Sequence, residues 1–158
     1  MDDKIKIKKT TKCDTRTLPK GAVVSKSDAY ADTILHREAV KACGQFLVNK
    51  LVNQFSKHDW SKLGEFLPEF TDGLNKGFDS EEFTKWYDKH VTSERHHLLK
   101  NVPEDVNLID VLEMLCDCVS AGMARTGKVF DVEVPADVLT KAVANTVKML
   151  IDNIEVED

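Results

Sequence analysis

The segment from Asn107 to Gly127, NLIDVLEMLCDCVSAGMARTG, constrains the fold more than any other part of the chain. Its apolar residues recur at intervals of three and four, which is the period of an amphipathic α-helix. Asn107 is a typical N-cap residue, and glycine is typical just beyond the end of a helix. The spacing therefore predicts one helix whose apolar face consists of Leu108, Val111, Leu112, Leu115, Val119 and Met123.

The same period and the same kinds of cap predict further helices from residue 27 onward. We expect a helix over 27–55, an element that begins near Ser61 and is interrupted at Pro68, a helix capped by Asp79 or Ser80 that runs toward Leu98, and a last helix from Pro135 to about Ile154. Residues 71–80 (TDGLNKGFDS) are predicted to be a loop because of their glycines, and 128–134 a short extended piece. The predicted fold class is all-α, a single compact helical domain.

Length and composition limit the class of protein. A chain of 158 residues is long enough to bury a core, and 42% apolar with 31% charged residues is ordinary for a soluble globular protein. No apolar run approaches the roughly 20 residues that span a bilayer, and the first ten residues lack the apolar stretch of a signal peptide. We therefore expect a cytoplasmic protein without a membrane partner.

Charge is distributed unevenly along the chain. Residues 1–26 hold eight Lys or Arg and three Asp, a local excess of +5, so the other 132 residues carry −10. We interpret 1–26 as a basic, partly ordered N-terminal arm with a short strand through Ile5 and Ile7, and 27–158 as the helical domain. The arm lacks aromatic residues for base stacking, and the body is acidic, so nucleic acid is not the expected partner.

All five histidines lie between residues 36 and 97, and one of them, His58, is followed directly by an aspartate, Asp59. Neutral imidazoles and carboxylates are ligands that divalent transition metals bind in proteins. The concentration of this residue type in one part of the chain indicates a metal site. The candidate ligands in this region are His36, His58, Asp59, His90 and His96.

Two acids on the predicted 107–127 helix extend this set. Glu113 and Asp117 are four residues apart, so their side chains lie on one face of the helix. Apolar neighbours place that face at least partly inward, where an uncompensated carboxylate is very costly. A metal ion, or a histidine or arginine beside it, would compensate the charge. Asp117 is a candidate ligand, and Glu113 is a candidate for orienting a ligating imidazole.

The positions of the other histidines leave alternatives open. His96 and His97 are neighbours and cannot both face one metal from a regular helix, so one is expected to be a ligand and the other a substrate contact or a surface residue. His36 precedes His58 by 22 residues, about 33 Å along an unbroken helix. Both would reach one site only if the chain turned back near Gly44 or Asn53.

The order of these residues resembles the H…HD…H…D signature of the HD-domain metal-dependent phosphohydrolases, an all-helical superfamily. The segments HREAV, KHDWSKLGEF, WYDKHVTSERHHLL and NLIDVLEMLCDCVSAGMARTG look closest to an uncharacterised HD-like family common in phages and bacteria. The resemblance covers residues 30–127, roughly two thirds of the chain. It implies a divalent ion (Mn, Ni, Co, Fe or Zn) held by His58, Asp59, Asp117 and either His36 or a later histidine.

The resemblance also implies hydrolysis of a phosphate ester, usually on a nucleotide. Asp59 would then ligate the ion and, with Glu113, orient the attacking water. Lys62 and Arg95 are candidates to neutralise phosphate charge, and His97 is a candidate substrate contact. Related nucleotidases often have a glutamate shortly after the HD pair, where this chain has Lys62, with Glu65 further on.

Two other classes of protein remain open. In an all-α nucleoside triphosphate pyrophosphohydrolase, clustered acids on helices hold magnesium, although that class has E-x-x-E and E-x-x-D spacing and this chain has three residues between Glu113 and Asp117. A non-enzymatic phage protein that binds a host factor is the second alternative. The apolar face of the last helix, with Val143, Val147 and Leu150, could pack internally or against a second copy in a homo-oligomer.

Overall fold

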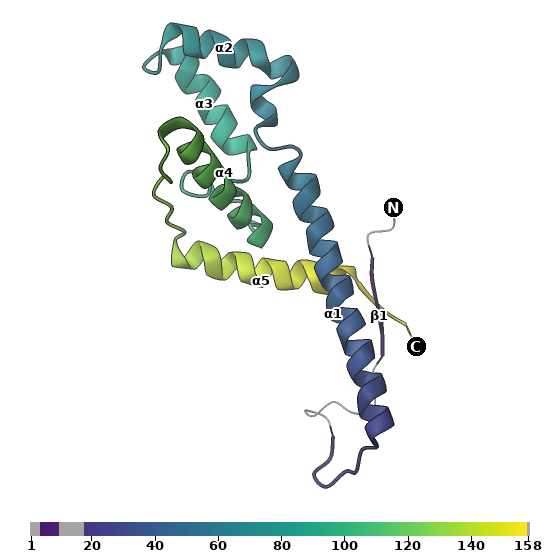
Figure 1. The fold of residues 1–158 in the computed structure, drawn as a ribbon. Coiled ribbons are helices and arrows are strands. Elements are labelled where there is room, and N and C mark those ends of the chain that lie inside the picture. The colour runs from purple at the N-terminus through teal and green to yellow at the C-terminus, as the bar shows by residue number, and fades with distance from the viewer. Residues whose placement is uncertain (1–3, 10–17, 158) are drawn as a thin grey trace. The chain divides into compact units, whose positions relative to one another are not determined.

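The computed structural model describes residues 4–9 and 18–157, and these are mostly helical (Figure 1). This confirms the prediction of an all-α protein, with one very short strand pair added. The elements are β1 (Ile5–Lys8), α1 (Lys26–Phe55), the 3-10 turns η1 (Trp60–Lys62) and η2 (Gly64–Phe66), α2 (Leu67–Lys76), α3 (Glu81–Ser93), α4 (Leu108–Thr126), α5 (Ala136–Asn153) and β2 (Ile154–Glu157).

The chain forms two compact units, whose boundaries fall within α1 and α5. One unit is built from the residues up to Lys50 and from Lys148 onward, and the other from Leu51–Val147. With the exception of His36, every residue of the predicted metal and substrate site lies in the second unit. The predicted division at residues 26 and 27 stays a prediction.

In the first unit, β1 pairs with β2 in parallel, with Ile5 opposite Ile154. The predicted strand through Ile5 and Ile7 is therefore present, and the Ile5 side chain is buried. At the start of α1, Ser25 Oγ accepts the Asp28 N–H at 3.0 Å, as expected of an N-cap serine. Residues 1–3 and 10–17 of the predicted basic arm lie outside the described residues.

The core of the second unit joins the segment before α4, the first half of α4 and the first turns of α5. It consists of Leu98, Val106, Val111, Met114, Val138 and Ala142. Residues at i, i+3 and i+4 share a helix face, which explains why Val111 and Met114 of α4 meet Val138 and Ala142 of α5. The Thr146 hydroxyl adds a polar link, accepting the Leu108 N–H at 2.9 Å.

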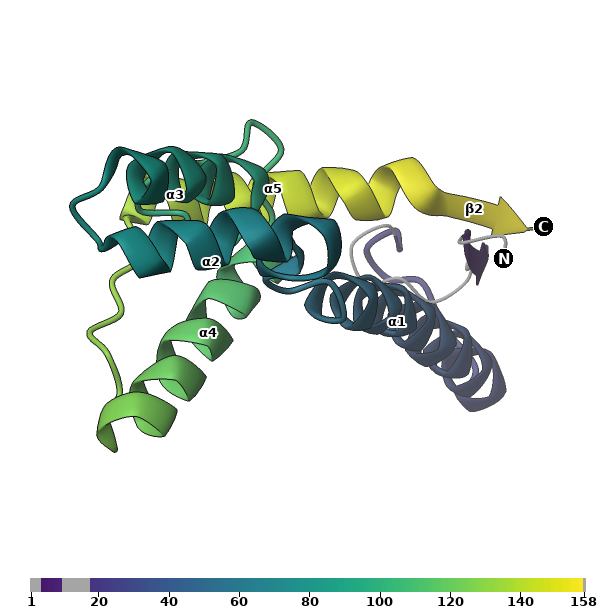
Figure 2. The same cartoon turned by 90° about the horizontal axis from the view of Figure 1, so that it is seen from above.

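The pair α2 and α3 lies side by side in both views (Figures 1 and 2). Here three predictions were wrong. Pro68 stands in the first turn of α2 and begins that helix, because its missing N–H would be unpaired there anyway. Residues 71–76 belong to α2, so the loop is shorter than predicted. The helix capped by Ser80 ends at Ser93 and does not continue toward Leu98.

Helix α4 has the predicted boundaries. Asn107 Oδ1 accepts the Ile109 N–H, and Asp110 Oδ2 accepts the Asn107 N–H, which closes a capping box. Gly127 ends the helix in the left-handed conformation, with φ of 70°. Gly122 allows the following segment to approach, since a Cβ there would lie 2.6 Å from Lys128 O. That segment, 128–134, belongs to neither a helix nor a paired strand, and it leads into α5.

None of the helices in the described part of the chain combines the length and the apolar character that a bilayer crossing requires.

Candidate metal centre

The His58-Asp59 pair lies in the tight bend that follows α1. Backbone N–H groups of His58 and Trp60 donate to carbonyls of Phe55 and Lys57, which turns the chain sharply. Asp59 adopts the left-handed conformation with φ of 57°, the one non-glycine residue with positive φ in the described part of the chain. This conformation is unfavourable for most residues and is tolerated best by Asn and Asp. The bend brings the His58 and Asp59 side chains toward the same group of histidines and acids.

Three side chains from three separate segments of the chain meet around His58. Its Nε2 lies 3.6 Å from Asp59 Oδ2 and 3.6 Å from Asp117 Oδ1. The rings of His58 and His96 have centroids 4.4 Å apart. His96 Nε2 lies 3.9 Å from Asp59 Oδ1. One nitrogen or oxygen each from His58, His96 and Asp117 lies within 4.8 Å of the others, so these residues could hold one ion.

A second group of imidazoles shares His96 with the first. The Nε2 atoms of His90 and His97 are only 2.7 Å apart, and ligand atoms of His90, His96 and His97 all lie within 4.8 Å. The prediction that His96 and His97 could not both face one metal assumed a regular helix, but α3 ends at Ser93 and the two residues follow in irregular turns. A helix would have separated their directions, and the turns do not.

Asp59 lies between the two groups. Its Oδ1 is 3.7 Å from His90 Nε2 and 3.9 Å from His96 Nε2. This oxygen is buried and accepts no hydrogen bond from the described residues. Buried carboxylate oxygens are nearly always paired, because leaving one unpaired costs roughly 1–3 kcal/mol or more. An unpaired oxygen faced by two imidazole nitrogens fits a metal ion as its missing partner.

The other oxygen of Asp59 has a cation beside it. Lys62 Nζ donates to Asp59 Oδ2 at 2.7 Å. Burial acts to raise the pKa of Asp59, but the hydrogen bond and the charge of Lys62 outweigh it, so the pKa lies below its ordinary value. The carboxylate is therefore ionised at neutral pH, as a metal ligand must be.

Protonation of the histidines differs within the cluster. Burial, together with the positive charges of Lys62 and neighbouring imidazoles, lowers the pKa of His90 to about 3. Burial, His96 and Lys62 lower the pKa of His97 to about 4. Burial acts against the charged form of His96 too, but Glu113 and two aspartates raise its pKa overall. His90 and His97 are thus neutral and able to ligate at pH 7, whereas an ion must compete with a proton at His96.

Glu113 is buried on α4, one turn before Asp117, and orients histidine rings. Its Oε1 accepts from His58 Nδ1 at 3.0 Å and lies 3.5 Å from His96 Nδ1. Burial acts to raise the pKa of Glu113, but the side chains of His96, Gln54 and His58 lower it to about 2. An ionised Glu113 makes His58 Nδ1 a donor, and Nε2 is the ring nitrogen that faces Asp59 and Asp117.

Arg95 is committed to acidic partners. Its Nε and Nη2 donate to the two oxygens of Asp110 at 2.7 and 2.8 Å, and Nη1 donates to Asp105 at 3.0 Å. The carboxylate of Asp110 is fully buried. These bonds explain why the pKa of Arg95 is raised above its ordinary value. They do not support the prediction that Arg95 binds a substrate phosphate.

His36 lies in the first unit, on α1. The turn near Gly44 or Asn53 that would bring it toward His58 is not formed, because α1 is continuous from Lys26 to Phe55. The ligand groups found among the described residues do not include His36. Its role as a ligand stays a prediction that this arrangement does not support.

Three further residues, which were not predicted from the sequence, form hydrogen bonds within or next to the cluster. Ser61 Oγ lies 2.7 Å from His90 Nδ1, and the Ser61 N–H donates to the buried Glu94 at 3.0 Å. Gln54 Nε2 donates to Glu113 at 2.7 Å. The available signals were local: Ser61 follows Asp59 by two residues, and Gln54 precedes His58 by four.

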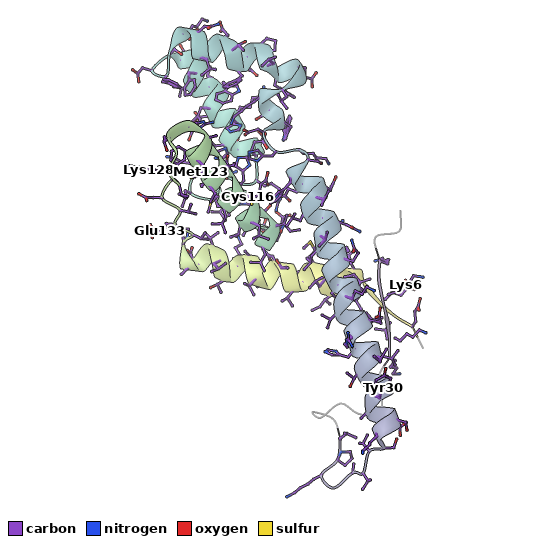
Figure 3. All side chains as sticks on the ribbon, viewed as in Figure 1. Lys6, Tyr30, Cys116, Met123, Lys128 and Glu133 are labelled. Carbon is purple, nitrogen blue, oxygen red and sulfur yellow. The ribbon has the colours of Figure 1, made fainter. Side chains whose placement is uncertain are left out.

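Two cavities adjoin the cluster within the second unit. One of about 190 Å³ is lined by Phe55, His58, Glu113, Cys116, Asp117 and Ser120, and the position of Cys116 on α4 is labelled in Figure 3. Another of about 240 Å³ lies on the side of Trp60, Arg95 and Glu94. The first cavity is lined by both His58 and Asp117, so a small molecule in it would contact two of the candidate ligand residues.

Comparison with known families gives one match. A family model described as a family of unknown function (DUF5662) matches residues 25–153. The chain belongs to this family. The region that matches DUF5662 runs from just before α1 to the end of α5, and it includes all the histidines and acids described above. No curated protein and no solved structure matches the chain. Membership of DUF5662 therefore does not indicate an activity.

Proposed function

We propose that this protein is a metal-dependent phosphohydrolase of the HD type that acts on a small phosphate ester, with a nucleotide as the expected substrate. The observation that carries the proposal is the unpaired Asp59 Oδ1, buried and faced by the Nε2 atoms of His90 and His96. A structural cluster of this kind would be expected to pair that oxygen. A site that holds a cation leaves it available.

The donor set indicates the kind of ion. His58, His96 and Asp117 would hold it together with Asp59, whose Oδ2 lies 3.6 Å from His58 Nε2. His90 lies 3.7 Å from the other oxygen of Asp59 and is in contact with His97. Imidazole with carboxylate suits manganese, iron, cobalt, nickel or zinc, whereas magnesium takes oxygen ligands almost exclusively. When bound, such an ion lowers the pKa of a coordinated water toward neutrality and polarises a phosphoryl oxygen.

The protein's own side chains would then position the reactants. Lys62 is in direct contact with a proposed ligand: its Nζ donates to Asp59 Oδ2 at 2.7 Å, where it can balance the charge of a phosphate. Glu113 fixes the ring of His58 through Nδ1. The cavity of about 190 Å³ beside His58 and Asp117 offers room for part of the substrate next to these groups.

The HD-type assignment of the fold is part of the same proposal. Support comes from an all-helical chain in which a His-Asp pair follows one helix, further histidines follow a second, and an aspartate lies on a third. The all-α pyrophosphohydrolase alternative is less favoured because its acids would need to gather around magnesium, and here imidazoles make up much of the cluster.

The test is metal content and activity in matched variants. The purified protein is expected to contain a transition metal by mass spectrometry and to hydrolyse deoxynucleoside monophosphates. His58→Ala and Asp117→Ala should each lose the metal and the activity together. His36→Ala and Asp131→Ala, a histidine and an aspartate outside the cluster, should keep both.

The outcomes separate the classes. Metal retained in both His58→Ala and Asp117→Ala would contradict the proposed site. Dependence on magnesium, with release of pyrophosphate from nucleoside triphosphates, would favour the pyrophosphohydrolase. A wild-type protein that binds no transition metal would favour the interaction protein without enzymatic activity.

A further inference from the structure

The carboxamide of Gln54 lies between two buried carboxylates near the end of α1. Its Nε2 donates to Asp110 Oδ1 at 2.7 Å and to Glu113 Oε2 at 2.7 Å. A primary amide nitrogen has two N–H donors, so both are in use. Asp110 and Glu113 are 0% and 4% exposed, which means that solvent contributes little to satisfying either carboxylate.

One of these carboxylates is rigidly held. Asp110 accepts two hydrogen bonds from Arg95, and its Oδ2 also accepts the Asn107 N–H of the α4 capping box. An Arg–carboxylate pair with two parallel bonds fixes the plane of the carboxylate. Gln54 is therefore attached to a fixed point at the start of α4.

The other carboxylate belongs to the metal centre. Glu113 Oε2 accepts from Gln54, and Oε1 accepts from His58 Nδ1 at 3.0 Å. With one oxygen held by the amide, the carboxylate cannot rotate freely about its own axis. Its second oxygen is then kept toward the imidazole.

We propose that Gln54 is a positioning residue: by holding Glu113, it fixes the tautomer and the ring orientation of His58. This inference rests on the proposed function, in which His58 Nε2 is a metal ligand. Groups that orient a metal-bound histidine through its second nitrogen typically change metal affinity by roughly 10–100-fold when they are removed. Gln54 acts one step further back, through Glu113.

A purely structural role is the competing explanation, because the same two bonds also join α1 to α4. Both roles predict a lower unfolding temperature when the amide is lost. Only the positioning role predicts that the state of the His58 ring changes in protein that is still folded.

The first measurement is made without metal, so that it does not depend on the proposed activity. The ¹⁵N NMR spectrum of the imidazoles should show the Nδ1–H tautomer of His58 in the metal-free wild type. Gln54→Leu removes both donors at similar volume and should give a mixture of tautomers. Gln45→Leu is the matched control, since Gln45 lies on the same helix and donates to the exposed Asn49.

The second measurement is a titration with Co²⁺, followed by its visible absorption. Gln54→Leu is expected to bind roughly tenfold more weakly and with an altered spectrum, and Gln45→Leu to match the wild type. Gln54→Glu replaces the two N–H donors by a carboxylate between two acids. This variant should bind Co²⁺ more weakly still.

An unchanged His58 tautomer in folded Gln54→Leu would overturn the inference, as would wild-type Co²⁺ affinity and spectrum in that variant. If the wild type binds no Co²⁺ while the tautomer responds to Gln54, the proposed function fails and the positioning of His58 stands. The two failures are thus distinguishable.

Discussion

Two polar clusters are buried in the same unit and share Gln54 as a neighbour, yet they differ in how completely they are paired. Around Asp110, both carboxylate oxygens accept two hydrogen bonds each, from Gln54, Arg95 and Asn107. Around Asp59, one buried oxygen accepts none from the described residues, and the buried Nδ1 of His96 has no hydrogen bond there either.

The difference teaches how to separate a structural cluster from a functional one. A saturated cluster gains all of its interaction energy within the protein, and its purpose is to hold helices together. An unsaturated cluster costs stability in the metal-free protein unless a ligand completes it. The left-handed backbone of Asp59, an unfavourable conformation at the same place, belongs with the second kind.

The largest expected effect comes from removing Asp110, the carboxylate on which the saturated cluster converges. Asp110→Ala would leave the Arg95 guanidinium and the Gln54 amide without their main acceptor and would break the α4 capping box. We expect a loss of about 3 kcal/mol in the free energy of unfolding, measured by urea denaturation. Asp105→Ala, which removes the exposed partner of Arg95, should cost less than about 1 kcal/mol.

If Asp110→Ala and Asp105→Ala were equally mild, the cluster around Asp110 would not be the structural anchor that its hydrogen bonds indicate. If Asp110→Ala kept its stability and lost metal binding, the two clusters would have exchanged roles.

The second challenge uses pH on the metal-free protein. The pKa values of His90 and His97, about 3 and about 4, lie below their ordinary value of 6.5 because of burial and nearby positive charge. As pH falls below 6.5 the unfolded chain takes up these protons and the folded protein does not. Stability should therefore decrease from pH 6.5 downward, and the decrease due to His97 should end near pH 4.

Replacing one of these histidines should flatten the curve. His97→Asn is expected to reduce the slope of unfolding free energy against pH by roughly 1.4 kcal/mol per pH unit between 6.5 and 4. Lys62 and His96 act against protonation of His97, and Asp59 and Asp117 favour it, so all four must be retained. His36→Asn is the control, and an identical slope in His97→Asn and wild type would contradict the assignment.

The sequence was sufficient for the parts of the fold that rest on local rules. The ends of α4 followed from Asn107 and Gly127, because capping depends only on neighbouring residues. Pro68 and the glycines of 71–77 indicated a break and a loop, but proline is also favourable in the first turn of a helix. Gly73 lies where Phe83 packs close to α2. Tertiary packing decided those positions.

The candidate site divides in the same way. The spacing of Glu113 and Asp117 predicted that they share one helix face, because four residues make about one turn. In the structure both contact the His58 ring. The paired directions of His96 and His97 depended on where α3 ends, which periodicity did not reveal. Arg95 looked like a phosphate ligand because its sequence neighbours are histidines, whereas its partner Asp110 is 15 residues away. Contacts of that kind require the fold.

The smallest expected effect concerns Lys62, which stands at the edge of the unsaturated cluster. Its Nζ lies 2.7 Å from Asp59 Oδ2 and so competes with a metal ion for that oxygen. Lys62→Met keeps the length of the side chain and removes the charge. We expect Co²⁺ to bind severalfold more tightly to this variant, an effect of about 1 kcal/mol for a partly exposed ion pair. Phosphate ester hydrolysis should nevertheless fall, because the cation that balances the substrate charge is lost.

Lys57→Met is the control, since it changes a lysine that lines the cavity beside Trp60. It should alter neither Co²⁺ binding nor hydrolysis. Weaker Co²⁺ binding in Lys62→Met would show that Lys62 supports the cluster as Arg95 supports Asp110, and the contrast between the two clusters would then lose its electrostatic part.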